Sequence, residues 1–459
     1  MHLAVAEKQQ EMSARSRLPF PGMALFFFQV CKAVAALCAA VLTYCGLLPV
    51  LVVLRGVQVL SVIALQSVAR CKRRRGQAKA TPMTVQDAFM LLEKDDNLCN
   101  IVAVLNLEGP ELHIEAFRAL VNETLLVPKP GEASESSDAA LTRRWPKLTQ
   151  RPVRLCGIWH WEDVGSSFRL EQHVKEERCG ADEASIAEVL ARLQSQPMCQ
   201  KRPLWDFRLA RPPGGGNIVF VRFHHSIGDG VALVNMFLEA TGNSIAAQPP
   251  KVGHRGLGKL LSWLLVLLLT PLEALIQICE RGDGSGIQPR ALRGKKRAAV
   301  SPPVPLARLK SVAQHEGCSV TAVSSACFGR ALTAGRHSGH LQEGSAGSYK
   351  VWMPVSLARA KGKLSHLENN ICFVPLELRG GSATDLCCIE QQLQRLKRGD
   401  LAFRLYLILQ GAMTLLPLPV ADAILNFCGN KAMGVMSSVP GPRTPLLWGK
   451  WQGPSLIFL

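Results

Sequence analysis

The stretch HHSIGDG, at residues 224–230, is the most informative part of this chain for its fold and its candidate site. It follows the apolar run IVFVRF at 218–223, which predicts a buried strand, and precedes VALVNMF at 231–237, which predicts a helix. A strand that ends in two histidines and continues through glycines places imidazole groups at the edge of a sheet, where a substrate can reach them. We therefore interpret the pair as catalytic rather than as core histidines beside an ordinary turn.

The composition narrows the class of protein. A length of 459 residues favours two domains, or one domain with membrane segments. Hydrophobic residues make up 48% of the chain and occur in blocks, which indicates membrane contact. The net charge of +18 favours an anionic partner. The chain has only three tyrosines and no helix-turn-helix or zinc-finger spacing, so we expect no nucleic-acid binding. Anionic lipids or the phosphates of coenzyme A are the expected anionic partners.

The 15 cysteines do not form a disulfide or metal-binding pattern. Their number is odd, no C-x-x-C occurs, and no Cys/His cluster has the spacing of metal ligands. We expect no metal, and a catalytic body in a reducing, cytosolic environment.

The N-terminal part of the chain predicts a membrane anchor. Residues 1–22 are polar and read as a flexible terminus, and residues 23–80 as an anchor whose basic flank CKRRR (71–75) faces the cytosol. The break GLLP at 46–49 leaves two alternatives, a hairpin of two spans or one span with an interfacial helix. The predicted location is the endoplasmic reticulum membrane, with the plasma membrane and lipid droplets as alternatives.

The remaining residues divide into two halves and a crossover. The first half spans 81–242, the crossover 243–303 and the second half 304–459. The crossover contains an apolar stretch at 257–278, predicted to dip into the membrane rather than cross it, and the basic run RALRGKKR (290–297), either a solvated connector or a contact for lipid headgroups. In the second half, the periodicity predicts helices at 306–316, 320–332 and 401–427, broken by prolines, and strands at 349–355 and 371–378. Strands mixed with helices indicate an α/β fold.

Further motifs accompany the histidines in a fixed order. They are MTVQDAFMLLE (83–93), VLNLEG (104–109), RPLWDF (202–207), MPVSL (353–357), NN (369–370) and SVPGP (438–442). In this order the chain resembles the wax ester synthase/diacylglycerol acyltransferases, relatives of chloramphenicol acetyltransferase, plant alcohol acyltransferases and peptide-synthetase condensation domains. The resemblance implies a two-lobed, chloramphenicol-acetyltransferase-like α/β fold, to which the apolar N-terminal part of the chain adds the predicted membrane segment.

The same resemblance implies a reaction. A membrane-associated O-acyltransferase would move a long-chain acyl group from acyl-CoA, its substrate, to a fatty alcohol or diacylglycerol, with no cofactor. His225 would be the general base, because an imidazole with a pKa near 6.5 accepts the hydroxyl proton and returns it to the leaving thiolate. A related enzyme with another acceptor, such as an amine or a carrier-bound thioester, and a non-catalytic membrane protein with the same fold are the alternatives.

The remaining site residues have expected roles. The full predicted set is His225, His224 and Asp229, supported by Gly228, Gly230, Asn369, Asn370 and Arg359. His224 is expected to support the loop, and Asp229 to hold its shape through Arg359 rather than to complete a triad with His225. The two glycines would let the backbone turn tightly. One of the two asparagines would supply an amide for the oxyanion or for the loop.

The chain stops 17 residues after Pro442, whereas the family continues for several tens of residues with a further strand and helices. We therefore expect a second half that is shortened at its end.

Overall fold

The computed structural model describes residues 21–53, 56, 60, 80–128, 144–155, 157–242, 257–282, 292–338, 348–357, 367–379, 383–398, 400–416, 418–439, 441 and 445–458. The predicted flexible terminus up to residue 20, the basic flank at 71–75 and Arg359 lie outside the described residues. The chain forms two units, one made of residues 1–54 with 254–280, the other of residues 55–253 with 281–459.

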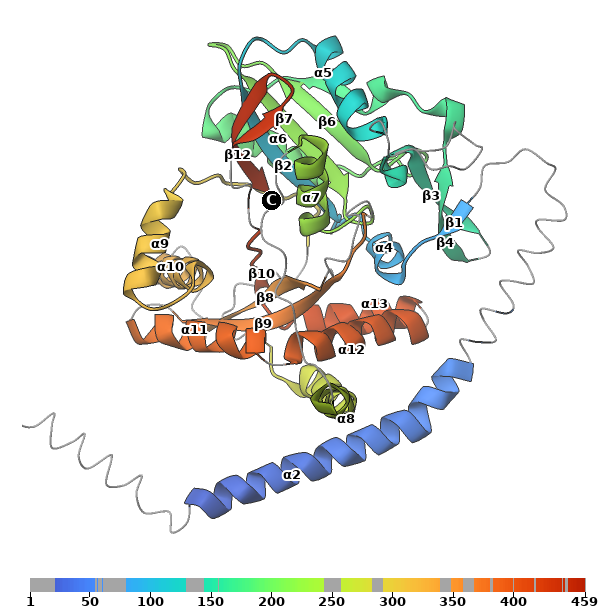
Figure 1. The fold of residues 1–459 in the computed structure, drawn as a ribbon, viewed down its shortest axis with the longest axis vertical. Helices are drawn as coiled ribbons and strands as arrows, with labels where there is room; N and C mark the ends of the chain where they lie inside the picture. Colours follow the sequence, from blue (N-terminus) through green and yellow to red (C-terminus); the bar gives the residue numbers. More distant parts are fainter. Residues whose placement is uncertain are drawn as a thin grey trace, which may run out of the picture. The chain divides into compact units, whose positions relative to one another are not determined.

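The larger unit contains the two catalytic halves (Figure 1). Its strands are β1 (Ala80–Pro82), β2 (Asn100–Glu108), β3 (Gln150–Leu155), β4 (Ile158–Asp163), β5 (Val174–Glu177), β6 (Trp205–Ala210), β7 (Asn217–His224), β8 (Ser348–Ser356), β9 (Ile371–Arg379), β10 (Gly434–Val435), β11 (Leu446–Trp448) and β12 (Trp451–Phe458). Its helices are α4 (Val85–Met90), α5 (Ile114–Val121), α6 (Glu183–Ser195), α7 (Gly230–Ala240), α9 (Leu306–His315), α10 (Val320–His337), α11 (Ala383–Arg398), α12 (Leu401–Leu415) and α13 (Leu418–Gly429), with short helical turns at η2 (Asn122–Leu126), η3 (Pro146–Thr149), η4 (Gly165–Ser167) and η5 (Leu170–Gln172). The strands and helices predicted on both sides of the histidines and in the second half are confirmed.

The first half is a sheet covered by helices on both faces. The strand order is β11-β12-β2-β7-β6-β5, and β7 pairs antiparallel with both β2 and β6. Helices α5 and α7 contribute to the hydrophobic cluster on one face, and α6 to the cluster on the other. Every residue of β7 is buried, as expected for a strand whose side chains are covered on both faces. The strand therefore carries its histidine end out of a rigid core.

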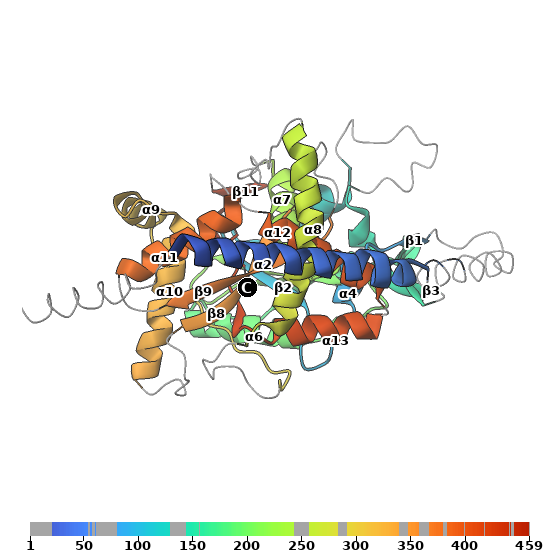
Figure 2. The ribbon, with the colours of Figure 1, turned by 90° about the horizontal axis from the view of Figure 1, so that it is seen from below.

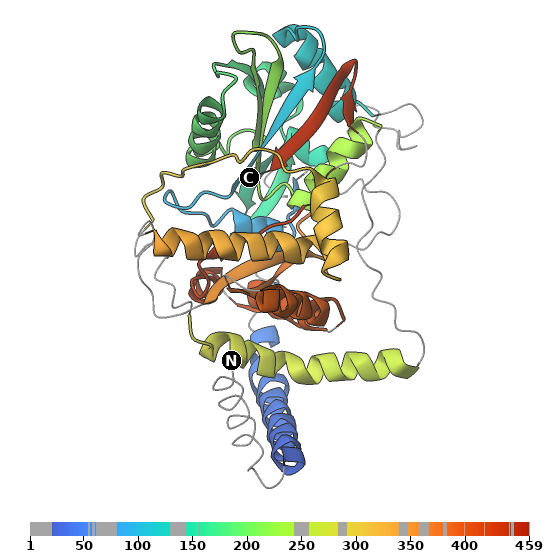
Figure 3. The same cartoon turned by 90° about the vertical axis from the view of Figure 1, so that its left-hand side faces the viewer.

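The last strands of the chain belong to this first sheet. β12 pairs antiparallel with β2, and Figure 3 shows the two side by side although they come from opposite ends of the larger unit. The predicted second half, 304–459, thus supplies strands to two of the sheets, its own and that of the first half. Strand β12 thus lies between β11 and β2, and its pairing with β2 joins the second half of the chain to the first sheet.

The second half has its own sheet, with strand order β10-β8-β9. Residues of α10 and α11 pack against β8 and β9 in one cluster, and α12 packs against the same strands in another. The predicted break in the apolar stretch 401–427 is confirmed, because α12 ends at Leu415 and α13 begins at Leu418.

The basic run of the crossover is partly docked on the first half. The backbone amide of Lys296 donates to Ser195 Oγ at 2.8 Å, and its Nζ donates to the carbonyl of Leu98 at 2.6 Å. Ala298 and Val300 pack against the cluster beneath α6. The described part of this run is therefore a strap bound to the sheet, not a freely solvated connector.

The smaller unit consists of α2 (Pro21–Val41), the π-helical turn η1 (Leu42–Leu47) and α8 (Leu257–Cys279). Residues 48–53 are also helical, so the turn that a hairpin would need at 46–49 is absent from this described stretch. The wider π turn directly before Pro49 gives a physical reason, since such turns accommodate a residue that cannot continue the regular hydrogen-bond pattern. Within the described residues, Cys31–Val53 is the helical stretch long and apolar enough to cross a membrane.

Helices α2 and α8 cross in contact with each other (Figure 2). Pro271 lies inside α8 and has no N–H for the carbonyl of Leu267, four residues earlier. The hydroxyl of Tyr44 donates to this carbonyl at 2.6 Å. A helix of this unit therefore satisfies the backbone group that the proline of its neighbour leaves open.

Candidate active site

His225 is the first residue after β7 and is half-buried. Its backbone amide donates to the carbonyl of Cys99 at 2.8 Å, which holds the start of the loop against β2. The side chain is thus presented at the end of the central strand of the sheet, as the sequence predicted.

The imidazole of His225 is held by an asparagine from the second half. The Nδ1 atom of His225 lies 2.9 Å from Oδ1 of Asn369. The Nδ2 atom of Asn369 donates to the carbonyl of His225 and to Oδ1 of Asp87, both at 2.7 Å. A carbonyl and a carboxylate can only accept, so the amide must direct its nitrogen to them and its oxygen to the imidazole. His225 therefore carries its proton on Nδ1, and the lone pair of Nε2 is available to a substrate.

The same geometry distinguishes the two asparagines, which the sequence could not. Both Nδ2 hydrogens of Asn369 are engaged, so this amide orients the imidazole and the loop and has no donor left for an oxyanion. Asn370 contributes through its backbone, because its N–H donates to Oδ2 of Asp229 at 3.1 Å.

His224 faces away from Asn369 into the core and is 1% exposed. Its Nδ1 accepts from the amide of Ser226 at 3.1 Å, which leaves the proton on Nε2, 3.2 Å from Oε2 of Glu93. Burial raises the pKa of Glu93, but its contacts with His224 and the amide of Cys99 outweigh this and lower the net pKa. The position fits the predicted supporting role.

Asp229 begins α7 and is buried. Its Oδ1 accepts from the amide of Ala232 at 2.9 Å, as an N-cap residue does, and its Oδ2 accepts from Asn370. The triad alternative is not supported, because the Nδ1 atom that a triad carboxylate would bind is bonded to Asn369. The expected partner Arg359 lies outside the described residues.

The expectation for the two glycines of the loop is corrected. Neither Gly228 nor Gly230 has a positive φ, so no left-handed turn requires glycine here. A Cβ on Gly228 would lie 3.6 Å from the backbone of Glu368, in ordinary contact with the second half, and one on Gly230 would lie 3.7 Å from Val439. The glycines thus mark where the two halves approach each other.

Two residues of the site have no role predicted from the sequence. Asp87, in the opening motif, forms an ion pair at 2.6 Å with Lys147, the second residue of η3, beside Asn369. The motif pointed to the region of Asp87 without giving it a role. No pattern in the sequence singled out Lys147.

The pH dependence of catalysis should reflect the burial of His225. Burial lowers the pKa of His225, and its backbone, Asn369 and the charge of Asp229 only partly oppose this. With the neutral imidazole as the predicted base, kcat/KM should stay constant from about pH 8 down to about pH 6.5 and fall only below it. In Asp229→Asn the opposing charge is gone, so the acid limb should move to still lower pH. An acid limb above neutral pH in the wild-type profile would contradict this assignment.

The motifs spread over the chain converge on this site. His224 donates its amide to the carbonyl of Leu204 in the RPLWDF stretch, and Leu357 donates to the carbonyl of Asn370. Residues 83–256 match the family model "Wax ester synthase/diacylglycerol acyltransferase catalytic domain", and residues 369–452 match "WS/DGAT C-terminal domain". The chain belongs to the wax ester synthase/diacylglycerol acyltransferase family. It is therefore a member of a family of acyltransferases, and the α/β fold that the motifs implied is confirmed.

Solved structures and a curated protein are similar to parts of this chain. The wax ester synthase/diacylglycerol acyltransferase from Marinobacter aquaeolei VT8 shares the fold, with a TM-score of 0.54, 18% identity, and coverage of 83% of this chain and 87% of that one. The first condensation domain of the calcium-dependent antibiotic synthetase gives a TM-score of 0.49 at 14% identity, with 83% and 85% covered. Wax ester synthase/diacylglycerol acyltransferase 7 of Arabidopsis thaliana is 29% identical over 86 residues, which span 17% of this chain and 18% of that protein.

Proposed function

We propose that this family member transfers a long-chain acyl group from acyl-CoA to a fatty alcohol or diacylglycerol, and so forms a wax ester or triacylglycerol. The observation that carries the proposal is the bond from Nδ1 of His225 to Asn369, which leaves Nε2 as a base. Acyl-CoA takes part as a substrate, and no further cofactor is proposed.

In the proposed reaction, Nε2 of His225 accepts the hydroxyl proton as the alcohol oxygen attacks the thioester carbonyl. The tetrahedral intermediate then collapses, the carbon–sulfur bond breaks, and the imidazolium returns the proton to the thiolate of coenzyme A. Throughout, Asn369 holds the Nδ1–H side of the ring, so that proton transfer is confined to Nε2. Membership of the family and the position of His225 at the end of β7 support this sequence of steps.

An acceptor comparison tests the proposal. Membranes that carry the protein should convert labelled palmitoyl-CoA to an ester with hexadecanol or diacylglycerol, measured by thin-layer chromatography. Hexadecylamine serves as the competing acceptor. If an amide is the main product, an enzyme that uses an amine acceptor is favoured. If no acyl group is transferred to any acceptor, a non-catalytic protein is favoured.

We also propose that the smaller unit attaches the protein to the endoplasmic reticulum membrane with the catalytic body in the cytosol. The apolar length of Cys31–Val53 supports an anchor. Large apolar side chains are exposed in the smaller unit, including Leu42 of η1 at 73% and Leu264 of α8 at 55%. Exposed apolar surface of this extent favours a lipid environment.

Extraction of membranes with carbonate checks the anchor. The full-length protein should stay in the pellet, and deletion of residues 1–70, which removes the apolar helix Cys31–Val53, should weaken attachment while α8 keeps some protein bound. Full-length protein in the soluble fraction would reject the anchor. Protection of the catalytic body from protease in sealed vesicles would reject the cytosolic orientation.

A further inference from the structure

The opening motif lies where the two halves meet, and its helix α4 is tied to both. Thr84 caps the helix by accepting from the amide of Asp87 at 3.2 Å. The side chain of Gln86, 2% exposed, donates its Nε2 to the carbonyl of Ile371 at the start of β9. The short helix is therefore bonded to the second sheet through Gln86, and the next residue, Asp87, makes the contacts described below.

Asp87 is fully buried and is bonded at both carboxylate oxygens. Its Oδ1 accepts from the side-chain Nδ2 of Asn369 at 2.7 Å and from the backbone of Asn369 at 3.3 Å. Its Oδ2 accepts from Nζ of Lys147 at 2.6 Å. The same Nζ donates to the carbonyl of Ile227 at 3.1 Å, inside the HHSIGDG loop. One carboxylate thus joins the opening motif, the histidine loop and the second half.

An asparagine amide does not select its own orientation, because its oxygen and nitrogen have nearly the same size. If Asn369 were turned over, its nitrogen would face the imidazole, Nδ1 of His225 would have to accept, and the proton would sit on Nε2. In that tautomer His225 cannot take a proton from a substrate. The orientation that leaves Nε2 free requires obligate acceptors at the other end of the amide.

We propose that Asp87 is a positioning residue for the acyl transfer, which acts through Asn369 to hold His225 in the tautomer with a free Nε2. The inference rests on the proposed function and assigns a role to the opening motif. A carboxylate is an obligate acceptor, so it turns the nitrogen of Asn369 away from the imidazole. Lys147 compensates the charge of this buried carboxylate and links it to the loop, in a position 5.3 Å above the ring of Trp161.

The test is Asp87→Asn, which keeps size and shape but replaces the obligate acceptor with a group that can also donate. Mutation of a residue that orients a catalytic side chain without touching the substrate typically lowers activity by about 10- to 100-fold. We expect kcat to fall by that factor, with KM for acyl-CoA nearly unchanged. In an Asn369→Leu background, the same change should have almost no further effect on kcat, because the residue through which Asp87 acts is gone.

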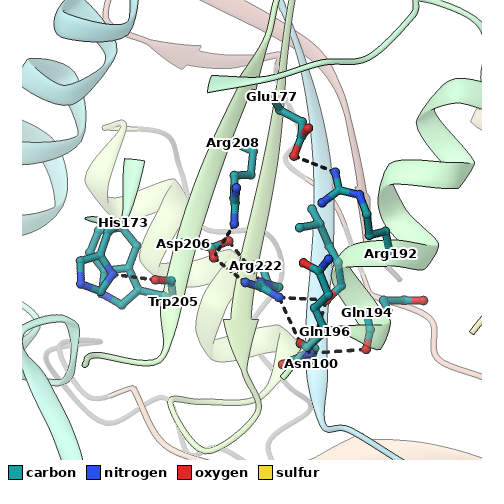
Figure 4. A network of polar contacts seen from close by, with 11 residues as sticks. Asn100, His173, Glu177, Arg192, Gln194, Gln196, Trp205, Asp206, Arg208 and Arg222 are labelled. Atoms are coloured by element: carbon teal, nitrogen blue, oxygen red, sulfur yellow. Dashed lines mark hydrogen bonds and ion pairs between the residues drawn. The ribbon is translucent and has the colours of Figure 1, made fainter. Parts of the chain in front are cut away.

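Asp206→Asn is the matched control. Asp206 is likewise a buried aspartate paired with a cation, since Nε of Arg222 donates to its Oδ1 at 3.1 Å, within the network that Figure 4 shows in the sheet. That network bonds to the end of α6 and not to Asn369. Asp206→Asn should lower the melting temperature, leave kcat of the folded enzyme close to wild type, and combine additively with Asn369→Leu.

A spectroscopic measurement distinguishes failure of this inference from failure of the proposed function. In ¹⁵N-histidine-labelled protein, with the signals of His225 identified by their loss in His225→Asn, the wild type should show the Nδ1–H tautomer and Asp87→Asn an increased share of Nε2–H. If the wild type transfers acyl groups but Asp87→Asn has the same kcat and the same His225 tautomer, the role of Asp87 is overturned. The proposed function would still stand. If the wild type transfers no acyl group, the proposed function fails, and the tautomer comparison alone decides the role of Asp87.

Discussion

Replacement of His225 with alanine is expected to lower the rate of acyl transfer by about 10²–10⁴-fold, the usual contribution of a positioned general base. Without the imidazole, the alcohol must lose its proton to water while it attacks the thioester. The side chain is half-buried and bonds to Asn369, a contact whose loss the surrounding core should tolerate, so the variant should fold. Initial rates per folded protein, with labelled palmitoyl-CoA and hexadecanol, measure the effect.

His173→Gln is the control for this variant. His173 is buried, stacks on the ring of Trp205, and bonds through Nδ1 to the carbonyl of Trp205 at 2.7 Å. Its loss should reduce stability, seen as a lower melting temperature, and leave the rate of the folded fraction near that of the wild type. A His225→Ala protein that keeps the wild-type rate would rule out this histidine as the base.

Asn369→Leu should have the second largest effect, a fall in kcat of about 10²–10⁴-fold. Loss of the group that fixes the tautomer of a catalytic histidine reaches the upper end of this range. Leucine is close in size, but it removes the Asn369 oxygen that faces Nδ1 of His225. It also removes the Nδ2 donor that bonds to Oδ1 of Asp87 and to the carbonyl of His225. A buried group without its partner costs about 1–3 kcal/mol, so the melting temperature should fall as well.

The neighbouring asparagine provides the matched comparison. Asn370 holds Asp229 through its backbone N–H, which Asn370→Ala retains, and its side chain has a 3.5 Å contact with the hydroxyl of Tyr406. The alanine variant should therefore lose less than about tenfold in rate, the equivalent of one neutral hydrogen bond. Equal losses in the two variants would show that the imidazole is not oriented by Asn369 alone.

Local patterns were enough to predict the elements that carry the histidines. β7 and α7 follow from an alternating apolar run and a helical period, because these patterns express how each residue meets the core on its own element. The cap at Asp229 was also visible, since an aspartate directly before a helical run is a common start signal. In the structure its oxygens accept from the amides of Ala232 and Asn370, and the predicted contact with Arg359 lies outside the described residues.

Long-range partners were decided by the fold alone. Asp87 and Asn369 are 282 residues apart, and Lys147 reaches Asp87 across 60, so no local pattern could pair them. The same holds for β12, whose apolar sequence fits either sheet until the packing beside β2 selects one.

The sequence by itself determined the family, the strand that ends in the histidines and the candidate base, since motif order and periodicity are properties of the chain. The tertiary structure decided which asparagine binds the base, which nitrogen of His225 stays free and which carboxylate orients the amide. The physical reason is that a hydrogen bond depends on the direction of donor and acceptor in space. That direction exists only once the two halves have packed against each other.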